Sequence, residues 1–170
     1  MLSISKYIRD TAASIITNDT TGFNPTLAAI CEDYGVQPFR LDFEKNTNFF
    51  QGWYGPKVLD ESSNFRYPAA YLYTIKSQNQ NLQKFATFSG AQMMGFDILL
   101  GFKKSSALPD TETLGDAVEA STYTMFNIAS WGDVTFNGDV TVMRSPLAFG
   151  ASNWLSLVRS TFSADYTTSV

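Results

Sequence analysis

Acidic side chains are the residues of this sequence whose types and spacing best suit acid–base chemistry. The chain has no histidine, which removes Ser-His-Asp and Cys-His catalysis and histidine metal sites. The nearest candidates are Asp97 on a predicted strand and the helical Glu112, Asp116 and Glu119. An exposed strand position is the simpler interpretation of Asp97, and a helix dipole favours acids in the first half of a helix. The residues therefore predict no catalytic site.

Other motifs that carry chemistry do not occur in the sequence. It contains no Gly-rich phosphate loop, no CxxC pair and no Asp-rich calcium loop, so we predict no cofactor and no metal. Cys31 is the single cysteine, which excludes an internal disulfide and favours a small buried hydrophobe over a reactive thiol. The sequon at Asn18 is interpreted as chance, because no secretion signal accompanies it.

Charge and hydropathy restrict the class of partner. The net charge is −4 and the pI about 4.7, which argues against a surface that grips nucleic-acid phosphates. No apolar run approaches the roughly 18 residues that a membrane helix needs. The N-terminal "MLSISKYIRD" lacks the apolar centre of a signal peptide. These features predict a chain that folds in the cytoplasm and has no membrane partner.

Composition leaves two interpretations open. Charged residues make up 16% of the chain against a typical value of about 25%, and aromatic residues make up 15%. Interfaces are enriched in aromatic side chains and depleted of Lys, Glu and Asp, so much of the surface is expected to be covered. One large core gives the same composition. The 170 residues are predicted to form a single domain, 1–170, that buries roughly 70% of the unfolded surface.

The first third of the chain predicts two helices and a strand. Residues 3–17 place their isoleucines on one helical stripe, which predicts an amphipathic helix. A short second helix is predicted to begin after Asn24, as its N-cap, and to end at Gly35. Residues 36–44 alternate apolar and polar side chains, as a half-buried strand does.

Residues 45–67 form a predicted loop with an unusual composition. The loop shows no period but contains six aromatic residues. Unstructured loops longer than about 12–15 residues are uncommon in compact domains and are usually functional or disordered. The aromatics oppose disorder, so the loop either folds over its own core or contacts a neighbouring subunit. The residues predicted to make an interface are Phe49, Phe50, Trp53 and Tyr54.

The second half predicts hairpins around one main helix. "PAAYLYTIKS" and "KFATFSGAQMMGFDILLGFK", joined by polar residues, predict a long β-hairpin. Residues 110–129 predict the main helix, with Asp110 as its cap. Asn137-Gly138 suits the two-residue turn of a second hairpin. The expected fold is a single α+β domain, with a mainly antiparallel twisted sheet flanked by an N-terminal helix and a second main helix.

The last predicted strand, "NWLSLVRSTFSADY", is apolar on part of both faces. Trp154, Val158 and Phe162 share one face, which is expected to join the core. Leu155 and Leu157 share the other face. We expect this second face to contact either a neighbouring subunit or a helix of the same chain.

The order of these elements resembles the tail-terminator and tail-completion proteins of tailed bacteriophages. The matching stretches are "SISKYIRDTAASII", "YPAAYLYTIKS" with "FATFSGAQMMGFDILLGF", "TLGDAVEASTYTMF", and "VTFNGDVTVM" with "NWLSLVRSTFSADY". The resemblance is one of pattern and covers nearly the whole chain. It implies a hexameric ring at the head-proximal end of the tail, which stops tube growth, joins the tail to the head connector and leaves a channel for DNA.

The resemblance also implies partners and a location. The partners are other copies of the chain and other neck and tail proteins, in a virion that assembles in the host cytoplasm. DNA passes without specific binding, and like charge keeps it from adhering to the channel. The carboxylates expected to face such a channel are Glu112, Asp116, Glu119, Asp133, Asp139 and Asp165.

Alternatives remain inside and outside the phage class. A head-side stopper, also called a head-completion protein, and a tail-tube protein are the nearest within it. Outside the class, a non-viral self-assembling or binding module is the next interpretation, followed by an enzyme that uses carboxylates. A closed ring distinguishes the assembling classes from a monomeric enzyme.

Overall fold

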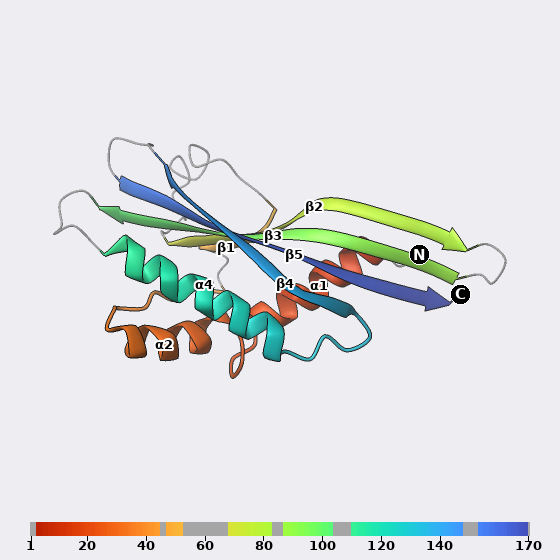
Figure 1. Ribbon diagram of the computed structural model, residues 1–170, viewed down its shortest axis with the longest axis horizontal. Coiled ribbons are helices and arrows are strands. Elements are labelled where there is room, and N and C mark those ends of the chain that lie inside the picture. Colours follow the sequence, from red (N-terminus) through yellow and green to blue (C-terminus); the bar gives the residue numbers. More distant parts are fainter. Residues whose placement is uncertain are drawn as a thin grey trace.

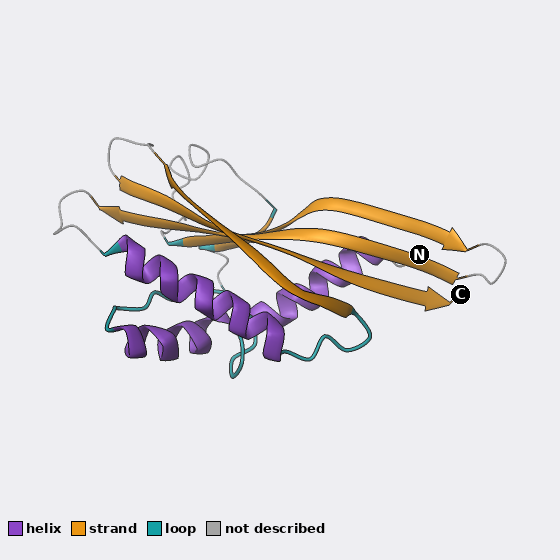
Figure 2. Ribbon diagram, in the orientation of Figure 1, coloured by secondary structure: helices purple, strands orange, loops and turns teal. Residues whose placement is uncertain are grey.

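A computed structural model describes residues 3–44, 47–52, 68–82, 87–103, 110–147 and 153–169 of the chain. Within them the chain forms two layers, with helices on one face of a five-stranded twisted sheet (Figures 1 and 2). The α+β class predicted from the sequence is confirmed. The elements are α1 (Ile4–Ile16), α2 (Phe23–Tyr34), β1 (Phe49–Gln51), β2 (Ala69–Leu82), β3 (Thr87–Lys103), α4 (Thr111–Ile128), β4 (Thr135–Leu147) and β5 (Asn153–Ser169).

The helices begin at residues that satisfy their first N–H groups. The Ser3 side chain accepts a hydrogen bond from the Lys6 backbone at 3.3 Å and caps α1. Asp110 caps α4 by accepting from the Thr113 backbone at 2.9 Å, and this bond lowers the pKa of the Asp110 carboxyl. Both caps follow from residue type, because a short polar side chain reaches back to the exposed N–H groups of the first turn.

The second helix begins two residues earlier than predicted. Its N-cap is Gly22 rather than Asn24, and α2 starts at Phe23. The Asn24 side chain is buried and forms two hydrogen bonds of 2.8 Å with the backbone N–H and C=O of Leu41. Asn24 is therefore a structural link to a distant segment, and the prediction that it caps α2 is wrong.

Residues 36–44 form no strand and do not belong to the sheet, and Phe43 and Glu44 lie in a turn. Asn24 bonds Leu41 on one side, and Asn48 accepts from the Asp42 backbone at 2.6 Å and donates to the Arg40 carbonyl at 3.0 Å. Two side-chain amides thus satisfy backbone groups that a neighbouring strand would otherwise pair. The predicted strand is wrong: the segment is irregular and is held by hydrogen bonds with the side chains of Asn24 and Asn48.

The sheet has the order β1-β2-β3-β5-β4, in which only the β1–β2 pair is parallel. β2 and β3 form the long hairpin predicted from the sequence, from Ala69 opposite Leu99 to Leu82 opposite Thr87. β5 pairs with β3 along 153–169 and with β4 on its other side. The last strand is therefore an interior strand of the sheet.

Asn137-Gly138 forms a bulge where a hairpin turn was predicted. β4 is one strand from Thr135 to Leu147, and its register against β5 shifts between Phe136 and Val140. Gly138 has φ 85°, a conformation that suits a bulge as well as a tight turn. The second hairpin of the sequence-based prediction is thus replaced by the β4–β5 pair.

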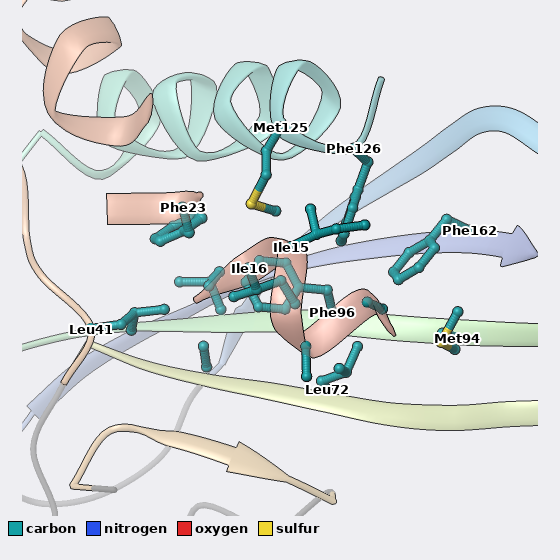
Figure 3. Close-up of a cluster of buried hydrophobic side chains, with 14 of the residues drawn as sticks. Ile15, Ile16, Phe23, Leu41, Leu72, Met94, Phe96, Met125, Phe126 and Phe162 are labelled. Carbon is teal, nitrogen blue, oxygen red and sulfur yellow. The ribbon is translucent and has the colours of Figure 1, made fainter. Parts of the chain in front are cut away.

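The main core lies between the helices and the sheet (Figure 3). Phe126 of α4 lies 4.3 Å from Phe162 of β5 and 6.2 Å from Phe96 of β3, between ring centroids. Val158 and Phe162 are each 2% exposed, which confirms that these two residues of the last strand join the core. The side chain of Trp154, predicted to share this face, lies outside the described part of the structure. Cys31 is fully buried in the same cluster, and burial raises the pKa of its thiol.

Candidate interface on the sheet

Among the described residues, the helices cover one face of the sheet and leave the other without a helix (Figure 2). We call this second surface the helix-free face. It is built from residues that lie opposite one another on β2, β3, β5 and β4, because paired residues point to the same side of a sheet. Its three central rows are Ala69, Leu99, Leu157 and Ser145; Tyr71, Asp97, Arg159 and Met143; and Tyr73, Gly95, Thr161 and Thr141.

An ion pair between a buried carboxylate and a half-buried arginine lies in the centre of the helix-free face. The Asp97 side chain is fully buried, so the prediction of an exposed strand residue is wrong. Arg159 stands opposite it on β5 and donates from Nε to both carboxylate oxygens at 3.1 Å and from Nη2 to Oδ2 at 2.9 Å. The Tyr73 hydroxyl donates to Oδ2 at 3.0 Å. The carboxylate therefore accepts hydrogen bonds from two side chains.

The electrostatics of this cluster favour a structural role. The hydrogen bond to Asp97 raises the pKa of Arg159 further above its usual range. Burial, followed by the negative charge of Asp97, raises the pKa of Tyr73. Both donors thus hold their protons at neutral pH, and the carboxylate is occupied as an acceptor. Such a cluster stabilises a buried charge and offers no base for catalysis.

Gly95 makes room for the tyrosine of this cluster. A Cβ atom on Gly95 would lie 2.5 Å from Tyr73 Cζ, so the ring lies over the glycine that pairs with it across the strands. An isolated glycine inside a predicted strand signals such a close approach. Asp97 and Arg159 are 62 positions apart in the sequence, so their pairing is not visible there, and only the register of β3 and β5 brings them together.

A small apolar cluster lies beside the ion pair on the helix-free face. Tyr71 is fully buried and Leu99 is 3% exposed, and Phe50, Tyr73 and Leu157 pack against them. The Phe50 ring stacks on Tyr71 with 5.9 Å between centroids. Leu157 therefore contacts its own chain through the sheet face and does not lie under a helix.

The other predicted interface residues have different positions. Phe49 is 6% exposed and packs edge-on against Phe43 in the main core, so its side chain serves its own chain and the prediction that it contacts a neighbour is corrected. Trp53, Tyr54 and the Leu155 side chain lie outside the described part of the structure. Most of the predicted loop 45–67 does so too, and its described residues, 47–52, contain β1.

The six predicted channel carboxylates do not share one surface. Arg144 of β4 pairs with Asp116 at 2.6 Å and approaches Glu112 at 3.9 Å on the helix side of the sheet. Asp133 accepts a hydrogen bond from the Tyr7 hydroxyl at 2.6 Å. Asp165 pairs with Ala91, which lies on the same side of β3 as Asp97, so Asp165 points to the helix-free side. Glu119 and Asp139 are exposed. Which carboxylates face a channel stays a prediction.

The described residues offer little that resembles a ligand site. One open crevice, of about 590 Å³, lies between residues 39–44 and the residues Thr17 and Asp19. The described part of the chain contains no group of three metal-ligating side chains. None of its helices has the length and hydropathy required to cross a membrane.

The outer edges of the sheet carry exposed apolar side chains. Among the described residues, β1 pairs with β2 only as far as Leu72, and β4 pairs only with β5. Ile75, next to the bulge of β2, is 46% exposed, and Met143 of β4 is 58% exposed. Edge strands with unpaired backbone groups are sites of association with other chains.

In comparisons with known proteins, the sequence matches no family model and no curated protein.

Proposed function

We propose that this chain is a structural subunit of a phage neck or tail. In this role it closes into a hexameric ring that terminates the tail tube, joins the tail to the head connector and leaves a channel for DNA. Its partners are further copies of itself and the adjoining neck and tail proteins. The proposal assigns it no catalytic activity and no cofactor.

One observation carries the proposal. The sheet has helices on one face only, and both of its outer edges keep long stretches that no described strand pairs. A lone subunit with such edges risks open-ended association, whereas closed rotational symmetry satisfies every edge.

The order of the elements gives further support. An N-terminal helix, a long hairpin, a main helix and two C-terminal strands follow one another, in the order on which the resemblance to tail terminators rests. The Asp97 carboxylate is buried and accepts hydrogen bonds from Arg159 and Tyr73, which disfavours the alternative of an enzyme that uses this carboxylate.

Oligomeric state and location test the proposal. We expect light scattering to give six times the 18.8 kDa chain mass and electron-microscopic class averages to show a six-fold ring. Antibodies to the chain should label tailed particles at the junction of head and tail. Label along the tail would favour a tail-tube protein, and a monomer in solution that labels no particle would overturn the proposal.

A further inference from the structure

Each outer edge of the sheet contains one regular stretch that is bounded by an irregularity. On β2 the register against β3 shifts between Thr74 and Lys76, and pairing is regular from there to Leu82. On β4 the register shifts between Phe136 and Val140. Near the other end of the strand, Pro146 has no backbone N–H and so cannot donate a hydrogen bond to a neighbouring strand. We call residues 76–82 the β2 window and residues 140–144 the β4 window.

These boundaries limit where another strand can add. Bulges and proline are devices that blunt the edge of a sheet against uncontrolled pairing. Here they leave windows of similar length on opposite edges, and neither has a strand on its outer side among the described residues. Met143, in the β4 window, is 58% exposed, and Ile75, beside the β2 window, is 46% exposed.

Within the single chain, both windows form hydrogen bonds with helices. Ser5 of α1 shares a hydrogen bond of 3.1 Å with Ser77 in the β2 window. Arg144 in the β4 window donates to Asp116 at 2.6 Å and to the Glu112 carbonyl at 2.8 Å on α4. Ordered edges lower the entropic cost of association, because little chain freedom remains to be lost on binding.

We propose that the β4 window of one chain pairs with the β2 window of a second copy of the same chain. This inference rests on the proposed function for the number of copies in the ring. The strand directions alternate along β2, β3, β5 and β4, so β2 and β4 run in opposite directions. A copy placed edge to edge in the same orientation therefore adds β2 to β4 as an antiparallel pair and continues the sheet.

The chemistry of the windows favours pairing of unlike edges. The β2 window, "KSQNQNL", is almost entirely polar, whereas Met143 of the β4 window exposes an apolar side chain on the helix-free side. Val140 and Val142 of the β4 window pack against the main core of their own chain. On the helix-free side, the stems of Lys76 and Gln78 are available to cover Met143 of the next copy. Pairing of unlike edges is head-to-tail, and a head-to-tail contact that closes into a ring leaves neither edge exposed.

Cysteine cross-linking tests the pairing directly. Gln78 and Met143 are both exposed on the helix-free side, and the native Cys31 is fully buried. The full chain carrying Gln78→Cys with Met143→Cys is treated with a short bis-maleimide and analysed under denaturing conditions. The flexible reagent tolerates a shift of two residues in register. We expect a ladder of covalent products up to the size of the ring.

The matched controls separate the two proposals. Each single variant, and Gln78→Cys combined with Tyr123→Cys on the exposed surface of α4, should give no ladder. A cross-linked dimer from Met143→Cys alone would overturn the head-to-tail pairing, because it places two β4 edges together. A ring by light scattering without cross-links in the double variant overturns this interface and leaves the proposed function intact. A monomer in solution that also labels no tailed particle overturns both.

Discussion

At the scale of single residues, the most consequential arrangement is the hydrogen-bonded group of Asp97, Arg159 and Tyr73. A carboxylate without solvent exposure is costly unless charged and polar partners compensate for its lost hydration. Arg159 of β5 supplies a positive charge and two N–H donor groups, and Tyr73 of β2, the strand on the other side of β3, supplies a neutral donor. The loss of either partner leaves the carboxylate with fewer donors in the same buried place.

Tyr73→Phe should change the alkaline stability of the protein. The pKa of Tyr73 is raised in the folded state, so folding retains the phenolic proton. This stabilisation is complete below the ordinary tyrosine pKa of about 10 and is lost as the pH rises toward the folded-state value. We expect Tyr73→Phe to lower the free energy of unfolding by about 1–2 kcal/mol at pH 7 and to flatten its fall above pH 10. Urea unfolding from pH 7 to 11 measures both.

Tyr7→Phe is the control for this experiment. The hydrogen bond to Asp133 raises the pKa of Tyr7 as well, so part of the alkaline loss belongs to that residue. Tyr7 lies on the helix side of the sheet, and its contribution should add to that of Tyr73. An alkaline profile of Tyr73→Phe identical to that of the wild type would contradict the role given to the hydroxyl.

At the scale of elements, α2 has a glycine at each end for different reasons. Gly22, the N-cap, has ordinary φ, but a Cβ atom there would lie 2.6 Å from the Ile16 carbonyl oxygen and closer still to that of Asn18. Gly35, the C-cap, has φ 71° and open space around it. The first glycine is required by the packed corner between α1 and α2, and the second by the backbone angle.

Asparagine substitutions should distinguish these two requirements. Asparagine tolerates the left-handed conformation, so Gly35→Asn should lower the free energy of unfolding by less than about 1 kcal/mol. Gly22→Asn should lower it by about 1–3 kcal/mol, because backbone oxygens cannot move away as a flexible side chain does. Thermal and urea unfolding measure the difference, and equal effects at both positions would contradict this account of the corner.

At the scale of the whole molecule, β5 holds the fold together. It lies between β3 and β4, and it contributes Val158 and Phe162 to the main core and Leu157 to the cluster on the helix-free face. β4 has no other partner among the described strands. The strand is therefore needed by both faces and by its neighbour on the edge of the sheet.

Truncation before Asn153 should abolish folding. Burial of a large apolar side chain contributes roughly 1.5–3 kcal/mol, and the truncation removes several together with two strand ladders, against a typical stability of about 5–15 kcal/mol. We expect the shortened chain to be insoluble or to unfold without cooperativity, as measured by circular dichroism. A control that lacks only residues 167–170 should keep cooperative unfolding. A soluble, cooperative chain without β5 would show that the sheet does not depend on it.

The sequence by itself determined the parts of the fold that depend on local chemistry. The helical stripe of residues 3–17 predicted α1, and the cap at Asp110 predicted the start of α4, because capping and amphipathic period act within one or two turns. Alternation over long runs predicted the β2–β3 hairpin and placed Val158 and Phe162 in the core. These signals use neighbours along the chain, so no tertiary information is required.

Only the tertiary structure decided the features that depend on which segments meet. Asn137-Gly138 permits both a turn and a bulge, and the continuous partner β5 selects the bulge. Asn24 suits a cap, but its amide bonds Leu41 instead. Asp97 is buried because the register of β3 and β5 places Arg159 opposite it. In each case the residue type allows several hydrogen-bond partners, and the partner that distant chain segments bring within reach determines its role.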